Sequence, residues 1–298
     1  MYDKNNLARL IISCPDKKGI VAAVSGLLYK NNANITESAQ HSTPGEKPQF
    51  FMRIVFEIQG LMDEKKGIRI KLEKDLKKLS KDINMSYGVS YLRKLKRMAI
   101  LVSRMDHCLN ELLWLWKSGD IEVEIPLICS NHEDLKELAE FYKIPYFYIP
   151  VKDGPLNAGE GLKRHERKLL SLLEKENIDF ITLARYMRIL SPGFLKSFNK
   201  KIINIHHSFL PSFPGAKPYE KAYEKGVKII GATAHFVNDE LDAGPIIEQD
   251  IIRIDHDDDI DEMKRKGKII EKNVLSRAVK WFSEDRIIEK GNRTIVFT

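Results

Sequence analysis

Short apolar segments alternate with segments of helical spacing from residue 98 onward. Nearly continuous apolar runs lie at 98–103, 123–129, 146–149, 180–183 and 201–205. Strands that are apolar on both faces belong to sheets covered by helices on both sides, as in parallel α/β folds. The pattern therefore predicts an α/β domain with a mostly parallel, Rossmann-like sheet. Ligands of such sheets bind outside the carboxyl ends of the strands.

Residues spaced as on one face of a helix lie between these runs. They predict helices over 108–116, 133–141, 161–176 and 192–196. A longer helix is expected over 260–282. The cluster before it, His256-Asp257-Asp258-Asp259, is typical of the amino-terminal cap of a helix.

The amino-terminal part of the sequence has a different order of elements. We expect strand 7–13, a helix from Ile20 to Asn31, strands 34–42 and 50–58, helix 63–79 and an extended run at 85–90. This βαββαβ order is the ferredoxin-like pattern. The basic connector 93–97 then indicates two domains, 1–92 and 93–298.

The segment 203–249 holds the densest group of chemically capable side chains. Asn204 and His206 stand two positions apart at the end of a predicted strand, so their side chains should project from the same face. Asp242 follows 36 positions after His206 (242 minus 206), in a Leu-Asp-Ala-Gly-Pro turn. A hydrolase, a transferase or a metal site could each use such a group.

Composition excludes several classes of protein. Hydrophobic residues make up 43% and charged residues 31%, as in an ordinary globular protein. No apolar run approaches the ~18 residues of a membrane span, and the first residues lack the order of a signal peptide, so we expect a cytoplasmic protein without membrane contact. Cys14, Cys108 and Cys129 are widely spaced in apolar sequence and are interpreted as buried free thiols.

The net charge of +7 raises the question of a nucleic-acid partner. Lysines such as Lys71, Lys74 and Lys78 are interleaved with Glu73 and Asp75, which is typical of a solvated helix face. We therefore expect no nucleic-acid partner.

Neither a dinucleotide nor a metal is expected. The loop 103–107 after the first apolar run contains no glycine, and the glycines of 153–161 follow no G-x-G-x-x-G pattern. His206, His207, His235 and Asp242 are ligand types, but their spacing matches no H-E-x-x-H or C-x-x-C scheme.

The segment LIISCPDKKGIVAAVSGLL, followed by NANI, resembles the ACT domain, a small regulatory fold that often binds amino acids. Asp16 and Gly19 match the D-x-x-G turn of that family between first strand and first helix. The resemblance implies an amino-acid effector site at Asp16, Gly19 and Asn34, or a domain that serves only to dimerise.

An ordered set of motifs resembles the formyltransferase fold family, whose members use formyltetrahydrofolate. The set consists of ARYMRILSP at 184–192, N-x-H at 204–206, S-x-L-P at 208–211, Pro214-Gly215, G-x-T-x-H at 231–235 and L-D-x-G-P at 241–245. The resemblance implies that Met187, Arg188, Ile189 and Leu190 line a folate pocket together with Val237. The resemblance also implies that Arg188 pairs with the anionic glutamate tail of folate.

The residue types suit formyl chemistry. A formyl group leaves nitrogen through a tetrahedral adduct with a negatively charged oxygen, for which the Asn204 amide and the His206 imidazolium are suitable donors. Asp242 can hold His206 in its charged form, deprotonate the nucleophile or relay a proton. We expect these three residues to be catalytic, with His235 and His207 in support.

The acceptor of the formyl group separates three enzymes with this core. The loop 103–107 lacks the glycine with which glycinamide ribonucleotide transformylases bind phosphate, and the tail after Phe282 is shorter than the RNA-binding domain of methionyl-tRNA formyltransferases. An ACT domain before this core, His207, NVLSRA and GNRTIVF are similar to the formyltetrahydrofolate deformylase family. Pro214 and Lys217 depart from its pattern and bear on the pocket lining.

This resemblance implies hydrolysis of formyltetrahydrofolate to formate and tetrahydrofolate, with formate supplied to purine synthesis and the one-carbon folate pools balanced. Folate is then the substrate, no bound cofactor is needed, and a homo-oligomer, dimer or tetramer, is expected. Two alternatives stay open: formyl transfer to an amine such as glycinamide ribonucleotide, and a non-catalytic sensor of folate or amino acids.

Overall fold

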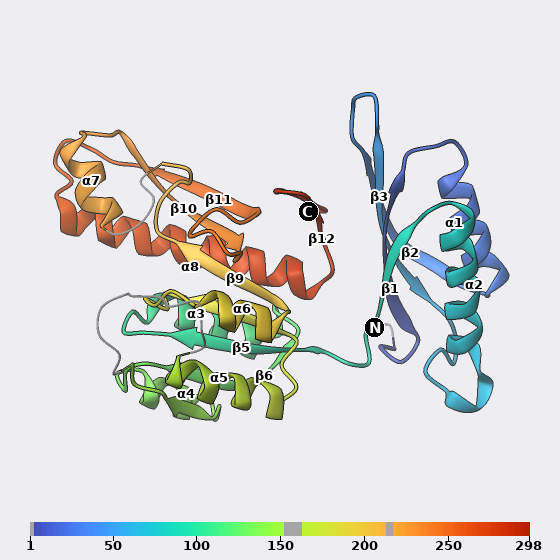
Figure 1. The fold of residues 1–298 in the computed structure, drawn as a ribbon, viewed down its shortest axis with the longest axis horizontal. Coiled ribbons are helices and arrows are strands. Elements are labelled where there is room, and N and C mark those ends of the chain that lie inside the picture. Colours follow the sequence, from blue (N-terminus) through green and yellow to red (C-terminus); the bar gives the residue numbers. More distant parts are fainter. Residues whose placement is uncertain (1–2, 152–162, 213–216) are drawn as a thin grey trace. The chain divides into compact units, whose positions relative to one another are not determined.

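The structure is a computed structural model that describes residues 3–151, 163–212 and 217–298 (Figure 1). Two compact units divide the chain. Unit 1 contains Met1–Leu95, Asp285–Lys290 and Ile295–Thr298, and unit 2 contains Lys96–Glu284 and Gly291–Thr294. The expected domain ranges, 1–92 and 93–298, stay a prediction.

Unit 1 is an antiparallel sheet in the order β2-β3-β1-β4, with α1 and α2 on one face (Figure 1). Apolar side chains of the central strands, among them Leu10 and Ile54, pack with Val24 of α1 and Leu72 of α2. The elements are β1 (Leu7–Pro15), α1 (Ile20–Lys30), β2 (Asn34–Ser42), β3 (Gln49–Glu57), η1 (Glu64–Lys66), α2 (Ile68–Asp82) and β4 (Ser86–Tyr91). The ferredoxin-like prediction is confirmed.

The carboxyl-terminal tail, which returns to unit 1 at Asp285–Lys290, contributes contacts made by charged side chains. Arg53 on β3 is almost fully buried and donates to Glu37, which also lies 3.4 Å from Arg286 of the tail. Lys290 donates to Thr43. Strands β12 (Ile287–Lys290) and β13 (Arg293–Val296) form a two-stranded sheet that was not expected.

Unit 2 is built on a sheet of seven strands in the order β11-β10-β9-β8-β5-β6-β7. The strands from β9 to β7 are parallel, whereas β10 and β11 are antiparallel to their neighbours. The strands are β5 (Lys96–Val102), β6 (Val123–Ser130), β7 (Tyr146–Tyr148), β8 (Phe180–Ala184), β9 (Lys201–His206), β10 (Ile229–Phe236) and β11 (Ile246–Arg253). The mostly parallel α/β prediction is confirmed.

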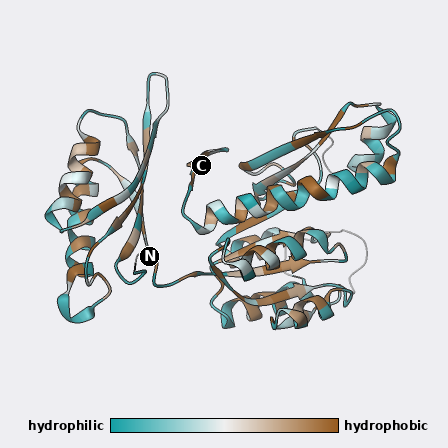
Figure 2. Ribbon diagram, turned by 180° about the vertical axis from the view of Figure 1, so that it is seen from behind, coloured by the Kyte–Doolittle hydropathy of each residue, from teal (hydrophilic) through white to brown (hydrophobic). Residues whose placement is uncertain are grey.

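Helices cover this sheet. Leu101 and Leu183 of the strands pack with Leu169 of α5 and Phe194 of α6, and α8 packs against β9, β10, β11 and α3. Figure 2 shows hydrophobic colour along the strands and alternating colours along α8. The helices are α3 (His107–Ser118), α4 (Lys136–Phe141), α5 (Arg164–Lys175), α6 (Pro192–Phe198), α7 (Pro218–Glu224) and α8 (Ile260–Ser283).

Asp259 caps α8 by accepting a hydrogen bond from the Glu262 amide, as predicted. The three cysteines are buried free thiols, as predicted. The glycine-containing segment 153–161, Pro214 and Gly215 lie outside the described residues. Among the described residues, no helix combines the length and the apolar character needed to cross a membrane.

Candidate active site

The end of β9 places Asn204 and His206 where the sequence predicts them. His206 is the last residue of the strand and Asn204 stands two positions before it. Antiparallel pairing with β10 sets Thr233 opposite His206 and His235 opposite Asn204. The pairing of β10 with β11 shifts register at His235, and such bulges commonly re-aim side chains beside functional sites.

Asp242 reaches this pair from the turn between β10 and β11. It has a positive φ of 56°, a conformation that Asp tolerates better than most residues. The turn requires glycine at position 244, because a Cβ on Gly244 would lie 1.8 Å from the Phe236 carbonyl oxygen. The Phe236 amide donates to Pro245, so the turn is closed against the end of β10.

Asp242 contacts both histidines. Its Oδ2 lies 3.2 Å from Nδ1 of His206, and its Oδ1 lies 3.8 Å from Nε2 of His235. The side chains of His206 and Asp242 are only 6% and 8% exposed, so water screens this pair little. Nε2 of His206 is buried and has no hydrogen-bond partner among the described residues. This nitrogen is therefore available to a ligand.

The partners of His235 define its protonation. Its Nδ1 lies 2.9 Å from the Phe236 carbonyl oxygen, so this nitrogen carries the proton and donates. Nε2 then accepts from Nδ2 of Asn204 at 3.2 Å. Burial lowers the pKa of His235, which favours the neutral ring. His235 thus orients the amide of Asn204.

A cavity of about 440 Å³ joins these residues to the predicted folate-binding segment. Met187, Arg188, Ile189, Leu190 and Val237 line it together with Asn204, His206, His207, His235 and Asp242. The structure therefore brings together all of the residues predicted as catalytic, supporting and folate-binding. Their roles stay predictions.

Buried polar groups fix the segment 185–191 that forms one wall of this cavity. Met187 donates its amide hydrogen to Ser103 Oγ at 3.0 Å. Ser191 donates from its amide and its hydroxyl to the buried carboxylate of Glu166, at 2.8 and 2.6 Å. Both ends of the wall are thus held by the fold of unit 2.

Thr233, the threonine of the G-x-T-x-H motif, connects this motif to the S-x-L-P motif by hydrogen bonds. Its hydroxyl donates to the Ser208 carbonyl at 2.9 Å and accepts from the Leu210 amide at 3.0 Å. Gln249 on β11 donates to the same hydroxyl and to the Leu210 carbonyl. The S-x-L-P segment after β9 is therefore tied to β10 and β11, behind the candidate site.

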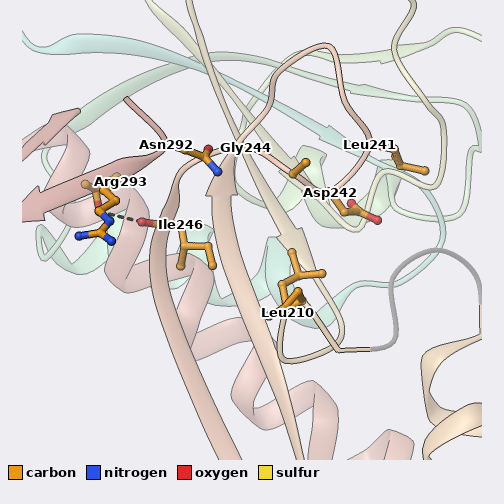
Figure 3. A pocket seen from close by; sticks show the side chains of 10 residues that line it. Leu210, Leu241, Asp242, Gly244, Ile246, Asn292 and Arg293 are labelled. Atoms are coloured by element: carbon orange, nitrogen blue, oxygen red, sulfur yellow. Dashed lines mark hydrogen bonds between the residues drawn. The ribbon is translucent and has the colours of Figure 1, made fainter. Parts of the chain in front are cut away.

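A second cavity of about 640 Å³ shares Leu241 and Asp242 with the first. Figure 3 shows Leu210 and Ile246 beside it, with Asp242 on the turn and Asn292 and Arg293 from the end of the chain. Thr294 Oγ1 donates to the Ile246 carbonyl at 2.7 Å. The lining of this second cavity is mostly apolar. Asp242 lines both cavities and lies between them.

A buried cluster beside the site was not predicted. Glu271 of α8 has a side chain only 2% exposed and lies 2.8 Å from His107 Nε2 and 3.3 Å from Arg185 Nε. Tyr219 donates its hydroxyl to Glu271 at 2.6 Å. The ring of His207 lies 5.7 Å from that of Tyr219, so the cluster continues to the supporting histidine.

The electrostatics of this cluster favour an ion pair. Burial opposes the charge of Glu271, but the His107 hydrogen bond and the Arg185 charge outweigh it and lower its pKa to about 2. Burial, with the charge of Arg185, lowers the pKa of His207 to about 3. Glu271 is thus charged and His207 neutral at pH 7.

His107, Cys108 and Glu271 are residue types that can bind a metal ion, and they lie close together. In the described part of the chain their ligand atoms lie within 4.8 Å of one another. The Arg185 guanidinium repels a cation there, and burial raises the pKa of Cys108 well above its ordinary value, so the thiol keeps its proton. The group fits an ion-pair cluster better than a metal centre.

The candidate effector residues do not form one site within one chain. Gly19, with φ of 90°, precedes α1, and Asp16 follows β1 where that strand pairs with Gln49. Asn34 pairs with Glu57 at the opposite end of β3. Antiparallel pairing therefore separates Asn34 from the other two by the length of the strand. An effector site at Asp16 and Gly19 stays a prediction.

Comparisons with known proteins agree with this architecture. Residues 96–279 match the Formyl transferase family and residues 8–66 match the ACT domain. The chain is thus a member of the formyl transferase family that carries an ACT domain.

Full-length relatives narrow the family further. Over 290 residues, 97% of this chain and 93% of the relative, it is 47% identical to a formyltetrahydrofolate deformylase of Bacillus subtilis. It is 42% identical to one of Synechocystis, with 99% of each chain covered. The chain belongs to the formyltetrahydrofolate deformylase family.

Solved structures of formyltetrahydrofolate deformylases and of related transformylases are similar to this fold. A formyltetrahydrofolate deformylase from Pseudomonas syringae superposes with a TM-score of 0.89 at 40% identity, covering 98% of this chain and 95% of that one. A glycinamide ribonucleotide transformylase from Symbiobacterium toebii superposes with 0.63 at 27% identity, covering 68% of this chain and 95% of that one.

Proposed function

We propose that this chain hydrolyses formyltetrahydrofolate to formate and tetrahydrofolate. The observation that carries the proposal is the buried pair of His206 and Asp242, 3.2 Å apart beside Asn204 in one cavity. The names of the full-length relatives support the choice of substrate and of water as acceptor.

Water attacks the formyl carbon, and the adduct oxygen becomes negatively charged. His206 in its charged form holds Asp242 at Nδ1 and donates from Nε2 to that oxygen. Asn204 has a second Nδ2 hydrogen, beyond the one given to His235, that can donate to the same atom. Loss of one such donor typically reduces turnover about a hundredfold to a thousandfold.

Collapse of the adduct breaks the bond between carbon and nitrogen. The nitrogen of tetrahydrofolate takes a proton, and the proton lost by water leaves through His206 and Asp242, which act as one coupled pair. Formate departs. No bound cofactor takes part, because folate is the substrate.

The folate ring binds in the cavity against Met187, Ile189, Leu190 and Val237, and Arg188 pairs with a carboxylate of the glutamate tail. Formate then supplies purine synthesis, and the reaction balances the one-carbon folate pools. An amino-acid effector at the ACT domain, a homo-oligomer and a cytoplasmic location stay predictions.

The test supplies the purified full chain with formyltetrahydrofolate and no amine, and measures formate. Asp242→Asn should fold normally and lose most turnover. Asp257→Asn is the control, because that side chain is 88% exposed. Undiminished formate release by Asp242→Asn would remove Asp242 from the mechanism.

A further inference from the structure

The strand order of unit 2 defines one place where a ligand crevice is expected. The chain runs from β5 outward to β6 and β7, and then returns to build β8 and β9 on the other side of β5. In open α/β sheets, ligands bind at this reversal, outside the carboxyl ends of the two strands that flank it. Here the reversal lies between β5 and β8.

Side chains of the protein itself occupy that crevice. Arg185 follows the last residue of β8, and His107 opens the helix that follows β5. Both converge on Glu271 of α8, at 3.3 Å and 2.8 Å. The side chains of Arg185 and His107 are only 10% and 9% exposed, so the carboxyl end of this strand pair is closed.

Two backbone features indicate that the closure is a specific part of the fold. Arg185 has a φ of 62°, a left-handed conformation that is unfavourable for a residue with a Cβ. Gly267 lies one helical turn before Glu271, and a Cβ there would lie 1.9 Å from the Tyr219 hydroxyl. Only glycine lets Tyr219 reach Glu271.

The closed crevice adjoins the reacting groups. Arg185 and His207 line the cavity that holds Asn204, His206 and Asp242. The ring of His207 lies 5.4 Å from that of His206. Nη1 of Arg185 is buried without a hydrogen-bond partner among the described residues, so it can donate to a water molecule in that cavity.

We propose that the cluster of Arg185, Glu271, His107 and Tyr219 fills the acceptor side of the site, excludes amine acceptors and leaves water as the nucleophile. The proposal rests on the proposed hydrolysis and names the residues that set its acceptor. In the excluded reaction, an amine nitrogen bonds to the formyl carbon and loses a proton, while the bond to the folate nitrogen breaks and that nitrogen gains one.

The test opens the crevice and offers a small amine. Arg185→Gly and Arg185→Asn both suit a positive φ and shorten the side chain. Each variant receives formyltetrahydrofolate and increasing glycinamide, and mass spectrometry measures N-formylglycinamide against formate. Arg104→Ala is the matched control, because Arg104 lies on the loop after β5 with a side chain 68% exposed.

The wild type and Arg104→Ala should yield formate at every glycinamide concentration. The share of turnover that ends as N-formylglycinamide should rise in the Arg185 variants, roughly tenfold to a hundredfold, the range that small changes of pocket shape produce. Unchanged partition in an active variant would overturn the proposal.

The wild type provides a second readout that does not depend on the variants. Formation of N-formylglycinamide by the wild type in as large a share as by the Arg185 variants would overturn the exclusion but leave hydrolysis intact. Absence of formate from the wild type without an amine would instead overturn the proposed function.

Discussion

Substitution of Glu271 by Gln should weaken unit 2 in a pH-dependent way. The carboxylate is buried, and its pKa falls from the usual 4.5 to about 2 in the folded chain. This difference corresponds to about 3 kcal/mol of stability, a contribution complete above pH ~4.5 and lost as pH falls toward 2. Glu271→Gln also leaves Arg185 buried without its charged partner, and breaking such pairs costs about 3–5 kcal/mol.

The assay is urea unfolding followed by tryptophan fluorescence. Trp114, Trp116 and Trp281 all lie in unit 2, so the signal reports that unit. At pH 7 the variant should be about 3 kcal/mol less stable than the wild type. By pH 4 the gap should narrow by roughly 1 kcal/mol, because the wild type alone loses the Glu271 contribution.

Glu140→Gln is the control, since its side chain is 61% exposed in a surface pair that should contribute less than about 1 kcal/mol. A Glu271→Gln deficit that is equal at pH 7 and pH 4 would refute the assignment of Glu271 as a buried charged group.

Further predictions concern the candidate site. Asp242→Asn should lower kcat roughly a hundredfold to ten-thousandfold with unchanged urea unfolding, measured as formate release; a loss under about threefold would contradict its role. Gly244→Ala should lower both activity and stability, because the new Cβ would lie 1.8 Å from the Phe236 carbonyl oxygen; a variant with normal turnover would refute the need for close approach. His207→Gln should leave the shape of the pH profile of kcat/KM unchanged between pH 5 and 8, because burial lowers the pKa of His207 to about 3; a displaced limb would show that His207 titrates there.

Local patterns in the sequence were sufficient for much of the candidate site. Asn204 and His206 lie two apart on a strand, and a strand places such residues on one face. Asp242 is followed by a glycine and a proline, residue types that indicate a turn. These signals depend on neighbouring residues, so they predict local structure well.

The Glu271 cluster depends on contacts between distant parts of the chain. Glu271 stands 164 positions from His107 and 52 from Tyr219, and its sequence neighbours are Ile270 and Lys272, as on an ordinary amphipathic helix. One signal was present: Gly267 lies inside a helix of 24 residues, where glycine costs about 1 kcal/mol relative to alanine. Such a glycine indicates close packing, here by Tyr219.

The return of the carboxyl-terminal tail to unit 1 also could not be predicted from local sequence patterns. Asp285–Lys290 contacts residues of β2 and the following loop through Arg286 and Lys290. These are charged contacts over more than 200 positions, and neither their residue types nor their spacing indicates a partner.

We have proposed that water accepts the formyl group at the site of Asn204, His206 and Asp242. The most direct measurement supplies the full chain with formyltetrahydrofolate, without any amine, in water enriched in oxygen-18, and analyses the formate by mass spectrometry. We expect equal amounts of formate and tetrahydrofolate, with one solvent oxygen in each formate. Formate that carries no solvent oxygen, or tetrahydrofolate that forms only when an amine is added, would contradict this proposal.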